Sequence, residues 1–287
     1  MRAAAARSQT HGDEGAIIKP GELVVATYPN GATLSAAALK ALVLMLHAAA
    51  GHAGDNKQHS IPKAVLRGTH AGTDRLRRVL AELSRTVLQV RITSPHGKPA
   101  IRSVPLLAET IEEIADDNRA TVFWRFSDRM QEIVASSDHY AELQRQTVLA
   151  LDSRYAIRLY ELGALYHRRA DPVWRGTIDQ LRDLFGVPAG RLRRWADVRR
   201  VVVEPAIAEV NQLTPFVATW EPVTHGLLVI GVQIRFWPKN DAGRTAAIKE
   251  VGASRVGRRV RREGATPRVV DPALAAAYDA LRRGEMP

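Results

Sequence analysis

Residues 153–169 read SRYAIRLYELGALYHRR, and no other stretch of the chain indicates its fold as clearly. Apolar residues recur at the spacing of an α-helix and leave a narrow basic edge, on which we place Arg154 and Arg158. A second helix is predicted over residues 195–211, directly after the basic run RLRR at 191–194. A packed helix followed by a basic helix, and then by a β-hairpin, is the order of a winged helix-turn-helix.

The residues around these two helices fit the same pattern. Thr177 is expected to cap a short helix that Gly186 ends. A first strand, the turn VTHG and an alternating second strand follow, and apolar residues at every second position of the second strand are expected to face the core. In order, these elements are predicted over residues 178–185, 216–221, 223–226 and 228–236. We therefore predict a winged-helix domain over residues 147–238.

The preceding part of the chain repeats this plan with a different sequence. Two long helices with a short helical segment between them are followed by two strands around the turn SPHGKP, and then by one more strand. In order, these elements are predicted over residues 33–50, 63–68, 73–87, 87–93, 94–99, 100–106 and 121–126. We predict a first winged-helix domain over residues 22–146, which opens on a short strand at 23–26.

Both ends of the chain are predicted to be tails. Residues 1–21 are polar and unpatterned, and we expect them to be disordered. Residues 239–287 form a basic C-terminal tail, with five arginines and no acid over 255–262 and a short amphipathic helix over 272–283. The predicted fold class is therefore α+β, with two tandem winged helix-turn-helix domains and flexible N- and C-terminal tails.

Bulk properties limit the classes of function. The chain has 287 residues and a formal net charge of +11, which favours a polyanionic partner because each cation placed on a phosphate releases a counterion. It has no cysteine, so disulfides, zinc fingers and thiol catalysis are excluded. No apolar run is long enough to cross a membrane, and no secretion signal is recognisable at the N-terminus. We expect a cytoplasmic protein with no membrane partner.

Three blocks in the right order resemble the plasmid replication initiators that bind iterons, the direct repeats of a plasmid origin. The blocks are SRYAIRLYEL at 153–162, TIDQLRDLFGV at 177–187 and VVVEPAIAEVN at 201–211. The resemblance spans about residues 22–238, but its N-terminal half matches only in pattern, through FSDRM at 126–130 and what precedes it. The basic tail after residue 238 lies outside the family core.

This resemblance implies two winged helices on one repeat of double-stranded DNA, with the second dominating base readout. The first domain then contacts the DNA backbone and takes part in dimerisation. The resemblance also implies a monomer that opens the origin and a homodimer that represses its own promoter. The host replicative helicase and the host initiator protein are the implied protein partners. The resemblance further implies a bacterial protein associated with plasmid or nucleoid DNA.

The predicted helix over 195–211 carries the main candidate DNA contacts. Its apolar residues share one face, while Arg193, Arg200 and Glu204 lie opposite and Arg199 lies at the margin. The N-terminal turn of a recognition helix reaches the bases, and arginine can pair bidentately with guanine in the major groove. Pro205 lacks an N–H group and predicts a bend. The candidate base or phosphate contacts are Arg191, Arg193, Arg194, Asp197, Arg199 and Arg200.

Further candidates lie at other basic or polar ends of elements. Ser153 and Arg154 are expected to bind phosphate, because a helix N-terminus offers unpaired N–H groups to an anion. In the first domain the candidates are the arginine stripe Arg75, Arg78 and Arg85 and the turn residue Lys98. In the second domain they are the turn residues Thr224 and His225. For each of these residues a solvated surface role is an open alternative.

Enzymatic functions find little support in the sequence. It has no His-x-His metal pair, no His-x-x-Arg and no Gly-x-x-x-x-Gly-Lys phosphate loop. We therefore expect no enzymatic activity, no cofactor and no metal. Two alternatives to an initiator are open: a winged-helix transcriptional repressor that never opens an origin, and an enzyme that nicks DNA through a tyrosine. The absence of a metal pair argues against the nicking enzyme.

Overall fold

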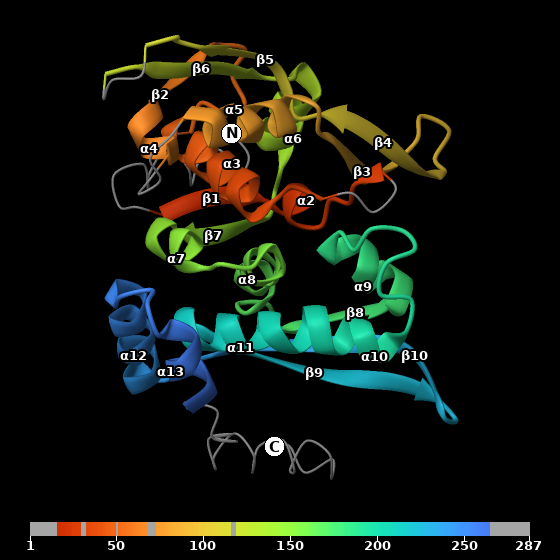
Figure 1. Cartoon of the computed structure of the whole chain (residues 1–287). Coiled ribbons are helices and arrows are strands. Elements are labelled where there is room, and N and C mark those ends of the chain that lie inside the picture. The colour runs from red at the N-terminus through yellow and green to blue at the C-terminus, as the bar shows by residue number, and fades with distance from the viewer. Residues whose placement is uncertain (1–15, 30–32, 50, 68–72, 116–118, 265–287) are drawn as a thin grey trace. The chain divides into compact units, whose positions relative to one another are not determined.

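The structure is a computed structural model that describes residues 16–29, 33–49, 51–67, 73–115 and 119–264. The described residues up to Val251 form one compact unit, and the described residues from Gly252 to Gly264 belong to a second. Among the described residues, no helix combines the length and the apolar character that crossing a membrane requires. The first unit contains both winged-helix domains (Figure 1).

The first domain combines three helices with a three-stranded antiparallel sheet. The helices are α3 (Ala36–Ala48), α4 (Lys63–Arg67) and α5 (Thr73–Ser84), and the strands are β2 (His59–Pro62), β5 (Leu107–Glu112) and β6 (Thr121–Phe126). The sheet order is β2-β6-β5. Ser35 caps α3 by accepting a hydrogen bond from the Ala38 N–H. Trp124 and Phe126 alternate into the core from β6, because residues two apart in a strand face the same side.

The second domain repeats this topology. Its helices are α8 (Arg154–Tyr166) and α9 (Ile178–Phe185), followed by the helical run α10 (Trp195–Val198), η2 (Arg199–Val203) and α11 (Glu204–Leu213). Its strands are β8 (Val173–Thr177), β9 (Phe216–His225) and β10 (Leu228–Pro238), in the sheet order β8-β10-β9. In both domains the last strand lies between the other two. Two tandem winged helices are thus confirmed.

Helix α9 begins and ends as predicted. Thr177 accepts from the Gln180 N–H while the Gln180 side chain accepts from the Thr177 N–H, which is a capping box. Gly186 ends the helix in the left-handed conformation at φ 61. Both ends of the helix were predictable because each depends only on residues within one helical turn of it.

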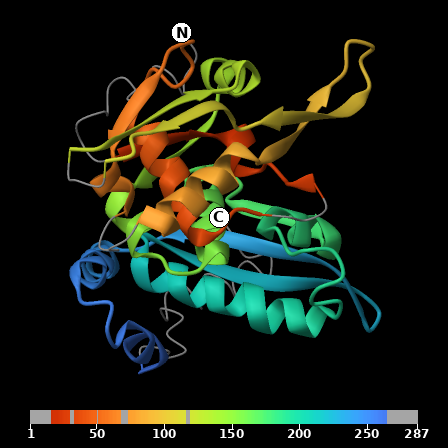
Figure 2. The same cartoon turned by 45° about the horizontal axis from the view of Figure 1, so that its top comes forward.

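Between α5 and β5 of the first domain the chain forms an additional hairpin. Strands β3 (Val87–Thr93) and β4 (Pro99–Pro105) pair with each other as a two-stranded sheet, as predicted, and reach outward from the domain (Figures 1 and 2). The sheet order places the wing of this domain at the β5–β6 connection. The expectation that the turn at 94–99 is the first wing is therefore wrong: it is the tip of an inserted hairpin.

The N-terminal boundary of the first domain also differs from the prediction. Residues 16–20, expected in the disordered tail, form β1 (Ala16–Pro20), and residues 23–26, expected as a strand, begin in the short helix α2 (Gly21–Val24). β1 pairs with β7 (Tyr140–Gln144), which lies between α6 (Asp128–Ser136) and α7 (Arg145–Ala150). All five residues of β1 are buried, so the strand is stabilised by a partner more than 100 residues away.

The predicted bend in the basic helix takes the form of a π-helical turn. η2 precedes Pro205, and the N–H of Glu204 donates to the carbonyl of Arg199, five residues back. A proline ring inside a helix clashes with the carbonyl four residues before it and cannot donate its own hydrogen bond. Widening by one residue accommodates the proline without interrupting the helix. Residues 195–213 are therefore one helical rod beneath α8 (Figure 1).

The segment after residue 238 is helical where the structure describes it, which corrects the prediction of a flexible tail from 239 onward. α12 (Asp241–Gly252) has Ala247 buried, and Val251 packs against the core of the first unit. In the second unit, α13 (Arg258–Gly264) follows. These helices escaped prediction because α12 has only a weak apolar stripe. The helix predicted over 272–283 lies outside the described residues.

Candidate nucleic-acid interface

The strongest candidate interface is the basic segment, which we define as residues 191–200. It comprises the loop at 191–194 and the start of the third helix of the second domain, which is α10 and the first two residues of η2. Arg193 and Arg194 are exposed, and within the described part of the chain neither guanidinium forms a hydrogen bond or an ion pair. Val198, Val202 and Ala206 are buried on the opposite face, so packing turns the arginines outward. The structure thus brings six of the predicted residues together, from Arg191 to Arg200, on one surface.

Two acidic residues accompany the arginines of this helix. Arg200 lies 3.5 Å from Asp197, and Arg199 lies 3.3 Å from Glu204. The side chain of Arg200 is 74% exposed, so these are surface pairs of small net strength. Arginines in weak surface pairs of this kind can exchange the carboxylate for a phosphate or a guanine edge.

The loop before the helix is fastened by Arg182. Its Nη1 and Nη2 donate to the carbonyls of Leu192 and Arg191, at 2.6 Å each. Leu192 has φ 48, the only left-handed non-glycine residue in the described chain, and this conformation costs about 1–2 kcal/mol for an L-residue. Such a conformation persists only where surrounding contacts impose it. Arg182 therefore presents Arg193 and Arg194 from a fixed loop.

The N-terminus of α8 is less open to phosphate than the sequence suggests. The Ser153 hydroxyl accepts from the Tyr155 N–H, and the carboxylate of Glu209 accepts from the N–H groups of Asp152 and Ser153. A carboxylate already occupies this helix terminus. Arg154 donates to the Tyr155 hydroxyl at 2.9 Å, and its guanidinium carbon lies 4.8 Å from the centre of that ring. Tyr155 packs edge-on against Phe185, so Arg154 lies near the end of α9.

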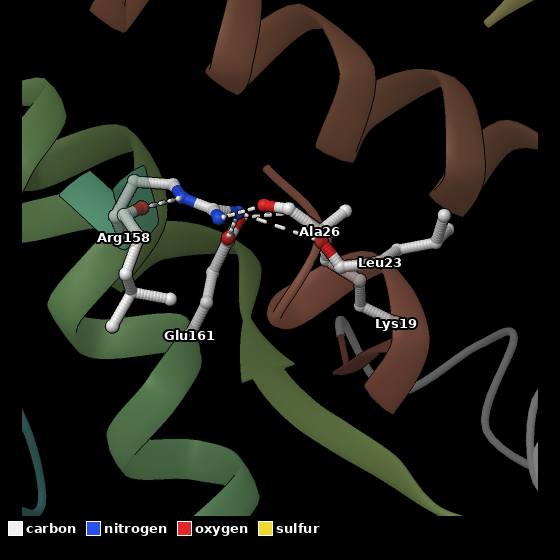
Figure 3. Close-up of polar contacts among 6 residues, drawn as sticks. Lys19, Leu23, Ala26, Arg158 and Glu161 are labelled. Carbon is white, nitrogen blue, oxygen red and sulfur yellow. Dashed lines mark hydrogen bonds and ion pairs between the residues drawn. The ribbon is translucent and has the colours of Figure 1, made fainter. Parts of the chain in front are cut away.

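Arg158, expected on the exposed edge of the same helix, is buried. Figure 3 shows its guanidinium between the two domains: Nη2 donates to the Ala26 carbonyl at 2.7 Å, Nη1 to the Leu23 carbonyl at 3.4 Å, and Nε to the Leu184 carbonyl at 3.2 Å. The expectation of an exposed Arg158 is wrong because carbonyls at the end of α2, invisible to a helical pattern, cover that position.

The buried arginine belongs to a three-residue ionic cluster. Glu161 lies 3.2 Å from Arg158 and 2.6 Å from Lys19, and all three side chains are inaccessible or nearly so. Burial lowers the pKa of Lys19, while the charge of Glu161 opposes that shift. Because Lys19 lies in β1 and the other two lie in α8, the cluster ties the domains to each other.

The arginine stripe of the first domain is exposed, as predicted. Arg75 forms no side-chain pair in the described chain, and Arg78 and Arg85 donate only through Nε to carbonyls of their own helical segment. Arg78 and Arg85 line a shallow cavity of about 530 Å³ together with Tyr28 and Thr33. The terminal nitrogens of both guanidinium groups remain available for phosphate.

Tyr28 and Thr33 also connect this stripe with the second domain. Tyr28 lines a second cavity of about 410 Å³ with Arg182 and Gly190, just before the basic segment. A Cβ atom at Gly186 would lie 2.2 Å from the Thr33 side chain, so the end of α9 packs directly on the first domain. The two candidate surfaces are therefore neighbours across one domain junction.

The remaining predicted contacts lie on the two hairpins. Lys98 is exposed at the tip of β3–β4. Thr224 and His225 are exposed at the end of β9, which extends through His225, so the turn lies at Gly226 and Leu227 rather than at 223–226. In Figures 1 and 2 both hairpins point to the same side as the start of α10.

Leu228 and Ile230, expected in the core, are exposed because they lie beyond the part of the sheet that packs on helices.

Sequence reasoning missed three contributors to this site. Arg182 reads as an ordinary surface residue of α9, and Glu209 as a polar residue of α11, because neither the loop nor the α8 terminus is close to them in sequence. Exposed Leu227 gave no helical or strand signal. The left-handed conformation of Leu192 also had no sequence signal, because leucine rarely adopts it.

Comparison with known proteins supports this architecture. Residues 16–164 match the model of a family described as initiator replication protein, WH1, and residues 177–236 match that described as initiator Rep protein, WH2. A search of curated proteins gave no match. Among solved structures, the chain is similar to a Pi initiator protein crystallised with iteron DNA, with 14% identity, a TM-score of 0.58, and coverage of 79% of this chain and 98% of that one. This likeness concerns the fold.

Proposed function

The chain belongs to the initiator replication protein family, and from this we propose that it initiates plasmid replication by binding direct repeats of the origin, the iterons. It acts as a sequence-specific double-stranded DNA-binding protein in the bacterial cytoplasm. The observation that carries the proposal is the basic segment, presented outward by a fixed loop at the start of the third helix of a winged helix. The solved Pi initiator of the same fold is bound to iteron DNA.

The second domain supplies the main recognition in this proposal. α10 and η2 enter a major groove, where Arg193 and Arg200 contact base edges and Asp197 orients Arg200. Phosphate contacts come from Arg191, Arg194, Arg199, Arg154 and the hydroxyl of Ser153. Thr224 and His225 approach the backbone from the wing. The carboxylate of Glu209 at the α8 terminus makes Ser153 the weakest member of this set.

The first domain supplies backbone contacts and the surface for dimerisation. Arg78 and Arg85 lie near the junction with the second domain, and Arg75 lies on the same helix, so the three approach the same duplex in an adjacent groove. Lys98 on the inserted hairpin reaches phosphate. We propose a first domain at residues 16–146, a second at 147–238 and then the basic C-terminal region; the pairing of β1 with β7 supports the earlier start of the first domain.

The steps after binding are proposed to be non-covalent. Several copies on neighbouring repeats bend the origin, an AT-rich stretch melts, and the host helicase and host initiator protein are recruited. A homodimer represses the chain's own promoter. No covalent protein–DNA adduct is expected.

Footprinting on the DNA beside its own gene tests this proposal against a repressor. We expect protection of direct repeats next to an AT-rich tract, with permanganate-reactive thymines in that tract when the wild-type chain is bound. Protection of a palindromic promoter alone, with no melted tract, would identify a repressor and reject the initiator function.

A further inference from the structure

The tip of the β9–β10 hairpin is apolar and open to solvent. We define the wing tip as residues 226–230. Leu227 is completely exposed, Leu228 is 67% exposed and Ile230 is 46% exposed. Three large aliphatic side chains gathered at one protruding point indicate a contact surface rather than chance exposure, because such clusters are uncommon on soluble surfaces.

The shape of the hairpin makes this tip a narrow projection. β8 pairs with β10 only over Gly231–Arg235, so the ribbon beyond Gly231 has two strands and no third. Gly226 has φ 59 and allows the tight turn, and a bulge lies between Val229 and Gly231. A two-stranded ribbon of this kind can present its tip to the minor groove of DNA, which is too narrow for a helix.

The wing tip is continuous with the basic segment. Trp220 of β9 packs edge-on against Trp195 at the start of α10, with 5.5 Å between the ring centres. The strand that leads to the tip is thus fixed to the helix that carries Arg199 and Arg200. Between Pro222 and Asn240 the sequence has no acidic residue, so phosphates do not repel this hairpin.

The wing of the first domain provides a contrast. Its exposed aliphatic residue, Ile114, is 89% exposed but follows Glu112 and Glu113. Asp116 and Asp117 come next in the sequence. Acidic side chains at this density oppose approach to a phosphate backbone. The sequence around the first wing is thus acidic, whereas the second wing combines an exposed apolar tip with a sequence free of acidic residues.

We propose that Leu227 and Leu228 enter the minor groove beside the basic segment and wedge open one base step. The proposal rests on the proposed function, since it needs α10 in the adjacent major groove. Aliphatic side chains inserted between base pairs unstack them and kink the duplex. The wing tip would then supply local distortion, which arginine contacts alone do not provide.

The test uses a duplex that the wild-type chain has selected from a random library, with 2-aminopurine substituted at successive positions. Unstacking raises the fluorescence of this base. We expect the wild type to raise it at one step flanking the protected major groove. The double variant Leu227→Ser/Leu228→Ser should lose that rise, while affinity falls by less than about tenfold and its salt dependence is unchanged, because no phosphate contact is removed.

The control is Ile114→Ser, which removes an equally exposed aliphatic side chain from the acidic wing and should behave as the wild type. The wedge is rejected if wild-type protein binds the selected duplex yet raises fluorescence at no position, an outcome that leaves the proposed function intact. If no duplex is selected at all, the proposed function itself fails. A change in the sedimentation coefficient of the Leu227→Ser/Leu228→Ser variant would instead make the tip a contact between copies and overturn the proposal.

Discussion

At the scale of the residue, two arginines four positions apart on α8 have opposite environments. Arg154 lies at the surface beside Tyr155, whereas Arg158 is 2% exposed and donates to three carbonyls and one carboxylate. Removing one member of a buried ionic cluster leaves the others charged in a poorly solvating environment. The cluster around Glu161 is therefore where a single polar substitution should affect stability most.

Glu161→Gln should lower the free energy of unfolding by about 3–5 kcal/mol, because Lys19 and Arg158 stay buried without their counter-charge. Urea unfolding followed by circular dichroism measures this difference. Glu132→Gln is the matched control: it removes an exposed carboxylate paired with Arg129 and should change stability far less. Equal effects of the two variants would show that the buried cluster has no special role.

Lys239 gives a prediction for pH. Its Nζ donates to the Asn211 carbonyl at 2.6 Å, and burial lowers its pKa to about 8. Between pH 8 and the ordinary lysine value the unfolded chain binds more protons than the folded chain, so this residue makes stability rise with pH. After allowance for its partial exposure, we expect about 1 kcal/mol between pH 8 and 9.5. Lys239→Met should remove that rise in parallel urea titrations; an unchanged slope would contradict it.

Arg193 and Arg200 test base readout. Arg193→Ala or Arg200→Ala should weaken binding to the repeat by about 1–3 kcal/mol and relax selectivity at one base pair. Fluorescence anisotropy on the repeat, on single-base variants of it and on random duplex gives both quantities, with Arg244→Ala as the control. If repeat and random DNA lose equal affinity, the substituted arginine contacts phosphate only.

At the scale of the element, the recognition helix depends on what precedes and interrupts it. Arg182 holds the carbonyls of residues 191 and 192, and Leu192 adopts a left-handed conformation that the loop imposes. The π-turn η2 fits Pro205 into the rod without breaking it. Both features set the direction of the arginines, although neither has to touch DNA.

Arg182→Met should release the loop while keeping most of the aliphatic packing of α9. The ordering of residues 190–194 then has to occur on binding, so affinity for the repeat should fall about tenfold with little change in affinity for random DNA. Hydrogen exchange of the Leu192 and Arg193 amides in the free protein should become faster in the variant. Loss of affinity without faster exchange would point to a direct DNA contact of Arg182.

At the scale of the whole molecule, the region after residue 238 has two parts with different roles. α12 contributes Ala247 and Val251 to the first unit, whereas the described residues after it belong to the second unit. The sequence from 253 onward contains eight arginines and four acids. The tail predicted from 239 onward therefore includes a packed helix, α12.

Truncation after Gly252 should reduce salt-sensitive binding to random DNA and spare selectivity for the repeat, because it removes cations and no packed residue of the first unit. Truncation after Pro238 should also lower the melting temperature, because it removes α12 and Lys239. Anisotropy at several salt concentrations and thermal unfolding separate the two effects. Loss of all repeat selectivity on the shorter truncation would place part of the recognition site in the second unit.

The sequence by itself determined the features that depend on neighbours along the chain. The helical repeat of α8, the capping box of α9, the strands β3, β4 and β6 and the outward arginines of the basic segment all follow from spacing within one or two turns. The order of these elements, with the three family-like blocks, was enough to indicate tandem winged helices.

Only the tertiary structure decided which partner each surface meets. It paired β1 with β7, showed the β3–β4 hairpin to be an insertion rather than a wing, and buried Arg158 against the Leu23 and Ala26 carbonyls, 135 and 132 residues away. The physical reason is that secondary structure follows from short-range periodicity, whereas the burial of a charge or a strand edge depends on groups that come near only when distant segments pack.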